Sequence, residues 1–226
     1  MNAISVLRLF GRKKGRKLSN KKNTLIKNLL PKISLEEKEN LQSILTNKAP
    51  IFLEFGFGQG ENLVKLSLAR PDWKFLGVDP YINGVASLLE KIDSKKIKNI
   101  LILHGDSRKF IKVLPENSIS EACILFPDPW HKSKHISRRL VQQELITDLS
   151  KIMILKSLIH ISSDDLKAQE WILKSFLNNS CFEWKVKSTK NCFIKPKMFE
   201  DTKYMLKAIE AKRKPIWLKF ENRKEP

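Results

Sequence analysis

Carboxylates stand in or just after successive apolar runs, and these acids are the residues of this sequence best suited to chemistry. Glu54, Asp79 and Asp106 each lie in or behind a run rich in Ile, Leu, Val and Phe. If the runs are strands of a parallel sheet, their carboxyl ends meet at one edge, where ligands of such sheets bind. An edge lined with carboxylates repels a pyrophosphate and attracts a cation. The sequence therefore predicts a binding site for a positively charged ligand.

A glycine-rich turn follows the first of these acids. Gly56, Gly58 and Gly60 have the spacing G-x-G-x-G, whereas the dinucleotide fingerprint is G-x-G-x-x-G. Glycine lets the backbone turn sharply and lie against a ligand, because a Cβ would occupy the ligand's volume. With Glu54 just before this turn, the pattern favours S-adenosylmethionine, whose amino group and sulfonium are both cationic. Taken alone, the pattern also fits a turn between any strand and helix.

Asp79 and Asp106 have two interpretations each. Asp79 lies roughly twenty residues after the glycine loop, where doubly wound folds place the acid that binds both ribose hydroxyls. It could instead cap the helix that follows. Asp106 is expected near the adenine, where it could accept a hydrogen bond from the exocyclic amine, or it could cap a helix that begins at Ser107. Both acids are candidate cofactor ligands, together with Glu54 and Gly56.

Asp128 is clamped between two prolines after the fourth apolar run. Pro129 bars Asp128 from the α region of backbone conformations, and Pro127 fixes the residue before it. An ordinary proline-rich turn needs one proline rather than two. A carboxylate held this rigidly beside a glycine loop is expected to face a substrate. Asp128 is therefore the candidate catalytic residue and a further candidate cofactor ligand.

Basic residues crowd the segment after Asp128. The segment contains Lys132, Lys134, Arg138 and Arg139 together with His131 and His135. Their charge suits phosphates, and Trp130 could stack on a base or pack beneath the loop. The H-x-x-x-H spacing of the two histidines does not predict a metal site, because neither a third ligand nor a general-base Glu is evident nearby.

The spacing of apolar residues predicts the elements that position these side chains. Strands are expected over residues 51–55, 73–79, 100–106, 121–126, 157–164, 182–187 and 216–220. Helical spacing fills most of the connections, and a short helix capped by Ser34 is expected over residues 34–45. Alternating strands and helices predict an α/β fold with a doubly wound, mostly parallel sheet and helices on both faces. A chain of 226 residues can form one substantial core.

The net charge of +19 indicates a polyanionic partner. An excess of this size raises the local concentration of nucleic acid and makes binding depend on salt. A membrane surface is the second interpretation. No apolar run approaches the roughly 20 residues that span a bilayer, so the protein itself is expected to be soluble. A bias toward lysine that reflects no partner at all is the third.

Residues 1–33 are expected to form a basic arm, and residues 34–226 a single domain. The first 23 residues contain eight Lys and Arg and no Asp or Glu. Such an arm could fold onto RNA, serve as a transit peptide or remain a solvated tail. It lacks the alternating apolar face of a transit helix. Three cysteines without a C-x-x-C pair indicate reduced thiols in an intracellular protein rather than a zinc site or a disulfide scaffold.

Two segments give the sequence a specific resemblance. It resembles the TrmB-type tRNA (guanine-N7-)-methyltransferase family in LEFGFGQGENL, residues 53–63, and in FPDPWHKSKHISRRLVQQE, residues 126–144. The hallmark of that family is a PDPW segment followed by His, Lys and a cluster of basic residues. The similarity extends from FGRKKGR to the closing PIWLKF. It implies the class I methyltransferase fold, S-adenosylmethionine as the methyl donor, and N7 of a variable-loop guanosine of tRNA as the acceptor.

The resemblance also implies residues that contact the substrate. These are Lys132, Asp164, Thr202, Lys203, Tyr204 and Met205 for the nucleotide, and Lys134, His135, Arg138 and Arg139 for the RNA around it. Asp164 matches the Asp of a Thr-Asp motif, although it could instead cap the next helix. Met205 stands where the family has Glu, so weaker discrimination or a lower rate is expected if that Glu binds guanine. The family's Gly pair before the fifth strand is also absent, and Lys156 lies in a shorter turn.

Other functions stay open at this stage. The fold could methylate a protein side chain or another RNA, or it could bind RNA without catalysis. Met205 supports the last alternative, whereas the retained acids oppose it. An NAD-dependent reductase disagrees with the glycine spacing. We expect a cytoplasmic enzyme that has tRNA as its partner and binds neither a metal nor a membrane. The sequence does not decide between a monomer and a homodimer, or whether the arm is ordered without RNA.

Overall fold

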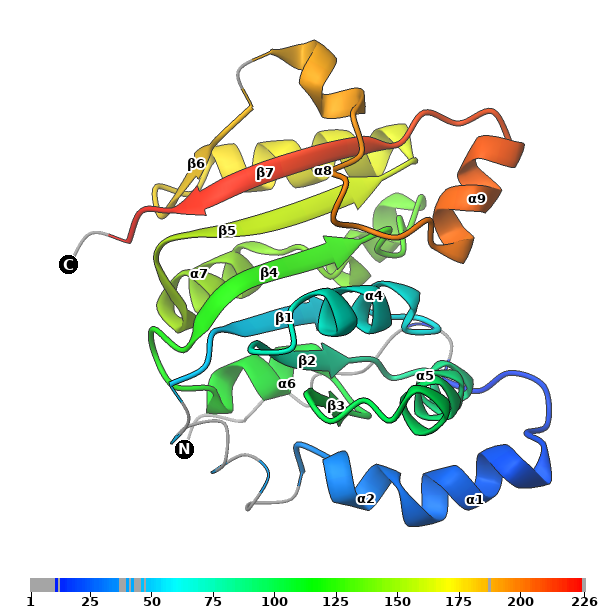
Figure 1. The fold of residues 1–226 in the computed structure, drawn as a ribbon. Coiled ribbons are helices and arrows are strands. Elements are labelled where there is room, and N and C mark those ends of the chain that lie inside the picture. The colour runs from blue at the N-terminus through cyan, green and yellow to red at the C-terminus, as the bar shows by residue number, and fades with distance from the viewer. Residues whose placement is uncertain are drawn as a thin grey trace, which may run out of the picture.

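The fold is built on one twisted sheet with helices on both faces. The computed structural model describes residues 11, 13–36, 40, 42, 46, 48–186 and 188–224. Among these, the strands are β1 (Ile51–Phe55), β2 (Lys74–Val78), β3 (Ile100–Leu103), β4 (Ile119–Leu125), β5 (Met153–Ser163), β6 (Phe182–Trp184) and β7 (Ile216–Asn222). They follow the order β3-β2-β1-β4-β5-β7-β6 (Figure 1). The predicted α/β class is confirmed.

Strand direction places all the candidate acids at one edge. The pairs β1–β2, β1–β4, β2–β3 and β4–β5 are parallel, whereas β7 runs antiparallel to β5 and β6. From β1, the chain adds β2 and then β3 toward one end of the sheet. It then returns to the other side of β1, where β4 and then β5 are added, so the strand order reverses between β1 and β4. Parallel sheets open a crevice at such a reversal, beyond the carboxyl ends of the two strands.

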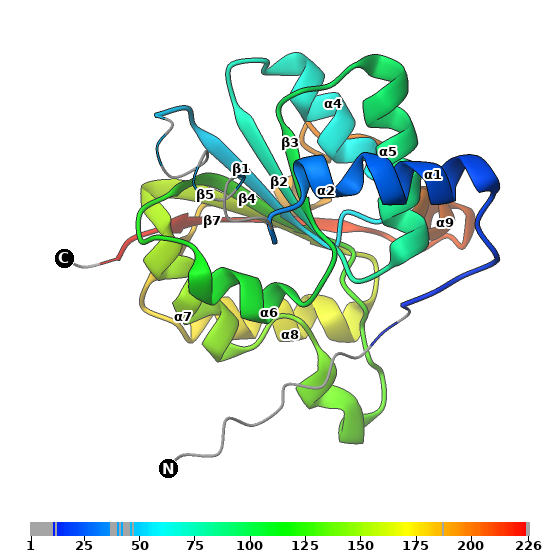
Figure 2. The ribbon, with the colours of Figure 1, turned by 90° about the horizontal axis from the view of Figure 1, so that it is seen from below.

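Helices cover the two faces of the sheet, as Figure 2 shows. One face carries α4 (Glu61–Ala69) and α5 (Ile82–Lys95), and the other carries α6 (Ser107–Phe110), α7 (Gln143–Ile152) and α8 (Leu166–Leu177). Successive strand residues alternate between these faces. Phe52 and Phe75 belong to the cluster beneath α4 and α5, and Leu53 belongs to the opposite cluster. Both clusters are apolar, which explains why the central strands read as continuous hydrophobic runs.

The N-terminal segment packs along the face that carries α5. Helices α1 (Asn20–Asn28) and α2 (Leu30–Ile33) lie on the outer side of α5 (Figure 2). Ser34 then forms a parallel bridge with Ile102 of β3. The helix expected over residues 34–45 falls largely on residues outside those that the structure describes. A separate arm over residues 1–33 stays a prediction.

Residues 13–17 are pinned to the start of α5. The side-chain amide of Asn83 accepts from the backbone N–H of Gly15 at 2.7 Å and donates to the carbonyl oxygen of Arg16 at 2.7 Å. The backbone N–H of Ile82 donates to the carbonyl of Lys13 at 3.1 Å. The basic side chains of this segment are exposed, so they add positive charge to the surface next to the start of α5.

Two further segments complete the fold. The segment after β4 contains the 3-10 helix η2 (Ser133–Arg138), and η1 (Ile111–Val113) precedes β4. The connection from β6 to β7 contains η3 (Thr189–Phe193) and α9 (Lys203–Glu210), which lies near the edge to which β4 and β5 point (Figure 1). Within the described residues, no helix combines the length and the apolar character needed to cross a membrane.

The contact between α5 and the glycine loop yields a stability prediction. A Cβ at Gly84 would lie 2.1 Å from the carbonyl oxygen of Gly58, so Gly84→Ala must push two backbones apart. We expect a loss of about 1–3 kcal/mol in the free energy of unfolding, measured by urea denaturation. Gly105→Ala is the control, because its Cβ would meet only Leu103 at an ordinary 3.7 Å. Equal stability of the two variants would contradict the close approach.

Candidate active site

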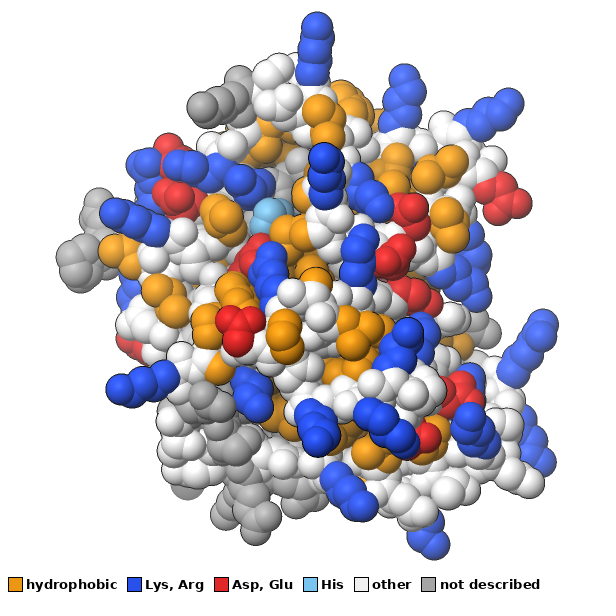
Figure 3. Space-filling view, viewed as in Figure 1, with side chains coloured by type: hydrophobic (Ala, Val, Ile, Leu, Met, Phe, Trp, Pro, Cys, Tyr) orange, Lys and Arg blue, Asp and Glu red, His pale blue; other side chains and the backbone are white. Residues whose placement is uncertain are grey.

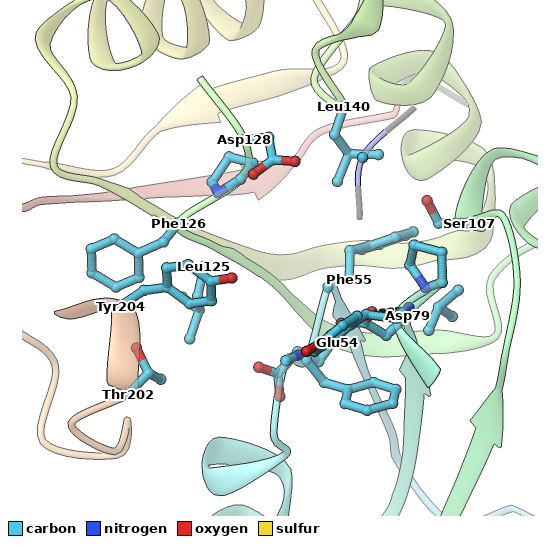
Figure 4. A pocket seen from close by; sticks show the side chains of 18 of the residues that line it. Glu54, Phe55, Asp79, Ser107, Leu125, Phe126, Asp128, Leu140, Thr202 and Tyr204 are labelled. Carbon is cyan, nitrogen blue, oxygen red and sulfur yellow. Dashed lines mark hydrogen bonds between the residues drawn. The ribbon is translucent and has the colours of Figure 1, made fainter. Parts of the chain in front are cut away.

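A cavity of about 320 Å³ opens at the edge where the strand order reverses. Its walls come from the ends of β1, β2 and β4, from the glycine loop and from the start of α9. Figure 4 shows Glu54 and Asp79 on one side of this cavity and Asp128 across from them. Thr202 and Tyr204 lie on a third side, in the segment that begins α9. Chain segments far apart in sequence therefore meet around one hollow.

The glycine loop has the backbone conformation for which glycine is suited. Gly56, Gly58 and Gly60 have φ angles of 71°, 59° and 76°, in the left-handed region. A Cβ on Gly56 would meet no atom within 4 Å, so this glycine faces open space in the cavity. A Cβ on Gly60 would collide with Leu88 at 2.6 Å. Gly56 thus leaves room for a ligand, and Gly60 allows helix packing.

Asp79 holds the glycine loop and the start of α5 together. One carboxylate oxygen accepts from the backbone N–H of Gly58 at 2.8 Å, and the other accepts from that of Tyr81 at 2.7 Å. Burial raises the pKa of Asp79 to about 6, against the lowering effect of these two hydrogen bonds. The charge of Asp128 adds a smaller upward effect. Whether Asp79 also binds a ribose stays a prediction.

Glu54 is the most deeply buried acid of the cavity wall, with 2% of its surface exposed. Burial raises its pKa to about 8, because an ionised carboxylate loses its hydration there. The side-chain amide of Asn62 donates to Glu54 at 3.1 Å and opposes this shift, whereas the charge of Asp79 adds to it. Near pH 7 the Glu54 carboxyl is therefore mostly protonated until a cation approaches it.

Asp106 behaves as a helix cap in this structure. It accepts from the backbone N–H of Arg108 at 3.0 Å and forms an ion pair with the guanidinium of the same residue at 2.7 Å. Although burial acts to raise its pKa, the hydrogen bonds and the charge of Arg108 hold that pKa below the ordinary value. Asp106 lines the cavity, so the capping alternative does not exclude the predicted contact with adenine, which stays a prediction.

The turn that carries Asp128 is strained on both sides. Phe126 and Trp130 have φ angles of 52° and 43°, in the left-handed region that side chains other than glycine rarely adopt. Such residues persist only where surrounding contacts enforce them, and they gather at functional sites. Burial raises the pKa of Asp128. The turn therefore aims a partly desolvated carboxylate into the cavity, as its two prolines predict.

Arg139 supplies contacts that hold this turn. Its guanidinium donates to the carbonyl oxygens of Pro129 at 2.9 Å and Trp130 at 3.4 Å, and lies over the ring of Trp171 at 5.0 Å. Only 9% of Arg139 is exposed. Arg138 lies over the Trp130 ring at 5.2 Å. Both arginines line the cavity. The structure shows these contacts within the protein, and contact of the two arginines with RNA stays a prediction.

The structure gathers most of the predicted site residues but not all of them. The cavity is lined by Glu54, Gly56, Asp79, Asp106, Asp128, Arg138, Arg139, Thr202, Lys203 and Tyr204. Outside its lining are Lys132, Lys134, His135, Asp164 and Met205. The first three belong to the segment around η2, and His135 packs edge-on against the Trp130 ring at 5.6 Å. Met205 packs at the edge of the cluster beneath α4 and α5.

Asp164 forms an ion pair with Arg213, which lies in the connection between α9 and β7. Its carboxylate accepts from the guanidinium of Arg213 at 2.5 Å. The cap of α8 is its neighbour Asp165, which accepts from the backbone N–H of Ala168 at 2.9 Å. The capping alternative for Asp164 is therefore wrong by one residue. A role of Asp164 at the substrate stays a prediction and would require an exchange of partner.

Two features of the site escape sequence reasoning. Gly11 lines the cavity although it is far in sequence from Asp128. A Cβ on Gly11 would lie 3.3 Å from the Asp128 carboxylate. Asn62 binds Glu54, and its only signal in the sequence is its place in the first turn after the glycine loop. Within the described part of the chain, no group of three or more His, Cys, Asp or Glu could hold a metal ion.

Comparison with known proteins gives a consistent picture. The family described as "Putative methyltransferase" matches residues 48–218. A tRNA (guanine-N(7)-)-methyltransferase of Rhodopseudomonas palustris is 33% identical, over 94% of this chain and 82% of its own length. The protein of the same name from Zymomonas mobilis is 30% identical, over 95% and 93% of the two chains. The solved 16S rRNA methyltransferase KamB has a TM-score of 0.59 at 12% identity, over 83% and 94%, which shows the fold alone.

The buried carboxyl of Glu54 predicts how stability changes with pH. Because its pKa is about 8 in the folded chain and 4.5 ordinarily, the folded state holds more protons between these values. Stability is therefore lost as pH rises from about 4.5 to about 8. We expect ligand-free Glu54→Gln to be more stable than the parent by roughly 1–4 kcal/mol at pH 8 and equal to it near pH 5. Denaturant unfolding at both pH values tests this, and a pH-independent difference would refute it.

Proposed function

The chain belongs to the family of tRNA (guanine-N7-)-methyltransferases, and we propose that it transfers a methyl group from S-adenosylmethionine to N7 of a variable-loop guanosine in tRNA. One observation at the site supports the use of S-adenosylmethionine in this proposal. A buried acid, Glu54, lies beside a left-handed glycine loop at the point where the strand order reverses. That arrangement suits a cationic nucleoside and disfavours a pyrophosphate.

The residues around the cavity fit S-adenosylmethionine. Gly56 faces open space, and the pKa of about 8 for Glu54 marks a carboxyl that lacks a compensating cation. We assign Glu54, Gly56, Asp79 and Asp106 to cofactor binding. When bound, S-adenosylmethionine supplies an electrophilic methyl group attached to a sulfonium. Glu54 would bind its positive charge, and Asp79 would keep the glycine loop in place through Gly58.

Guanine N7 needs no general base. Its lone pair lies in the ring plane and carries no proton, so catalysis requires positioning and electrostatic stabilisation. Positive charge develops on the purine as N7 is methylated. Asp128, fixed between two prolines and two left-handed residues, would place a carboxylate beside that charge. The ionised form is required, although burial raises the pKa of Asp128, and a cationic base next to it would favour ionisation.

Recognition of the base is assigned to the segment that begins α9 and to Asp164. Thr202 caps α9, and Lys203 and Tyr204 face the cavity beside it. Asp164 could accept from both N1–H and the exocyclic amine of guanine, if Arg213 releases it. Lys132 would hold a phosphate or the guanine carbonyl oxygen. Met205, which packs on the apolar cluster, offers no hydrogen bond to the base.

Binding of the tRNA body is assigned to basic surface around the cavity. Lys and Arg side chains project from much of the face in Figure 3. Lys134, His135 and Arg138 belong to η2 next to the cavity, and residues 13–17 are pinned at the start of α5. Phosphate contacts would offset the cost of freeing a base from the folded tRNA. We further propose that the protein acts in the cytoplasm, where tRNA is available.

Transfer of labelled methyl groups from S-adenosylmethionine to an unmodified tRNA transcript tests the proposal. We expect 7-methylguanosine at a variable-loop position and no transfer to a transcript with 7-deazaguanosine there, because that base lacks N7. Label on a protein, or on another position of the RNA, would replace this acceptor. Binding of tRNA without any transfer would indicate an RNA-binding protein that has lost catalysis.

The affinity for S-adenosylhomocysteine, which keeps the cationic amino group, should depend on pH. Glu54 must ionise to bind this cation, so the affinity is expected to rise toward pH 8, by up to about tenfold per unit, and then level off. Glu54→Gln should bind more weakly and lose the rise above pH 6.5, since the pKa of Asp79 is about 6. Calorimetry in buffers of different ionisation heat would also detect the released proton. An identical pH profile in both proteins would exclude Glu54 as the group that binds the cation.

Asp128 is expected to act on the reaction more than on cofactor binding. Asp128→Asn keeps the shape of the side chain but removes its charge, so methylation should fall by at least about 100-fold. The affinity for S-adenosylhomocysteine should stay within about threefold. The matched control is Asp93→Asn, at a half-exposed carboxylate in the last turn of α5 that pairs with Lys96 and lies outside the cavity lining. Parallel loss of affinity and activity in Asp128→Asn would make Asp128 a cofactor ligand only.

A further inference from the structure

The side chain of Asn62 forms hydrogen bonds with two segments on different sides of the cavity, one containing Glu54 and the other containing Glu200. Asn62 is the second residue of α4 and is 1% exposed. It lies over neighbouring positions of the sheet, because Glu54 of β1 pairs in register with Cys123 of β4. Its amide nitrogen is 3.1 Å from the Glu54 carboxylate and 3.9 Å from the Cys123 sulfur. One end of the amide thus contacts the acid assigned to the cofactor.

The other end of the amide contacts the chain on the substrate side. The carbonyl oxygen of Asn62 accepts from the backbone N–H of Glu200 at 3.3 Å. Thr202 follows two residues later, and its hydroxyl caps α9 by accepting from the backbone N–H of Met205 at 3.3 Å. The segment that presents Thr202 and Tyr204 to the cavity therefore begins at a residue bound to Asn62.

Other contacts hold the same segment without reaching the cofactor side. Lys65, one turn further along α4, donates to the carbonyl oxygen of Phe199 at 3.0 Å and lies 3.5 Å from the Glu200 carboxylate. Phe199 is fully buried and stacks on Trp217 with ring centroids 5.5 Å apart. These contacts fix the segment against α4. Asn62 adds to them a direct connection to Glu54.

Ionisation of Glu54 changes what Asn62 does. A hydrogen bond to a charged carboxylate is about twice as strong as one to a neutral acceptor. A cation that ionises Glu54 therefore strengthens the bond from the Asn62 amide nitrogen. Since the amide is planar, that bond also orients its oxygen toward the N–H of Glu200. The two hydrogen bonds of Asn62 thus become dependent on each other.

We propose that Asn62 is a positioning residue through which cofactor binding at Glu54 orders the Glu200–Tyr204 segment for the nucleotide. This rests on the proposed function, because the segment is the one assigned to the guanosine. The coupling is reciprocal, so tRNA binding would tighten cofactor binding by the same factor. Asn62 itself is not among the residues that line the cavity, so we assign it no contact with the reacting methyl group or the base.

The test measures tRNA affinity with and without saturating S-adenosylhomocysteine. For the parent protein we expect the cofactor product to tighten tRNA binding by about fivefold or more. In Asn62→Ala this ratio should fall to within about twofold of one. Asn62→Asp should lose the coupling as well, because it keeps an acceptor for Glu200 but repels Glu54 instead of donating to it. A purely structural role would leave the ratio unchanged.

Lys65→Met is the matched control on the same helix. It removes contacts to Phe199 and Glu200 but leaves Glu54 and Asn62 in place, so it should weaken tRNA binding equally with and without S-adenosylhomocysteine. Thermal melting checks that each variant is folded, and Asn62→Ser replaces Asn62→Ala if the latter unfolds. A ratio near one in the parent overturns the inference. So does a parental ratio in Asn62→Asp together with a parental ratio in Asn62→Ala, or in Asn62→Ser where that variant replaces it. Methyl transfer by the parent tests the proposed function separately, whatever the ratio.

Discussion

The removal of one carboxyl group from water is the constraint on which the rest of the site depends. Glu54 lies within a strand whose residues are all buried, and its ionised form is disfavoured until a cation replaces the lost hydration. The protein supplies partial compensation in the amide of Asn62. It leaves the remaining stabilisation to a ligand. In the function proposed above, affinity for a cationic nucleoside would arise from this unfavourable arrangement in the ligand-free protein. The large apolar clusters on both faces of the sheet supply the stability that tolerates it.

The surrounding elements keep this unfavourable arrangement in place. Asp79 joins the glycine loop to α5, and Gly84 of α5 packs directly on the carbonyl of Gly58. Asn83, the neighbour of Gly84, binds the basic N-terminal segment. The start of α5 thus connects the glycine loop with exposed positive charge. Asn62 makes the corresponding connection on the opposite side, toward α9. Side-chain hydrogen bonds at the starts of α4 and α5 therefore tie together the segments around the cavity.

Much of the fold could be predicted from the sequence, because apolar runs and glycine chemistry are local signals. They indicated the central strands and the acids at their carboxyl ends, whereas the strand order, and with it the point of reversal, came from the structure. What escaped prediction depends on distant partners. The pairing of Asp164 with Arg213 and the approach of Gly11 to Asp128 join segments whose separation in sequence carries no periodic signal. Strand β5 begins at Met153, earlier than expected, because α7 passes directly into it and Lys156 takes a left-handed conformation within the strand. Apolar spacing alone does not reveal such an irregular start.

The two left-handed residues beside Asp128 also have a consequence for engineering. Glycine would adopt these conformations freely, so a search for stabilising substitutions would select Phe126 and Trp130 as positions to replace. Yet Phe126 packs edge-on against Trp217, and Trp130 packs in the same way against His135, so both rings brace the turn from outside. Glycines there would remove the bracing together with the strain. A more heat-resistant version of this protein would then hold the Asp128 carboxylate less firmly. With the catalytic role proposed for Asp128, thermostability would be gained at the expense of turnover.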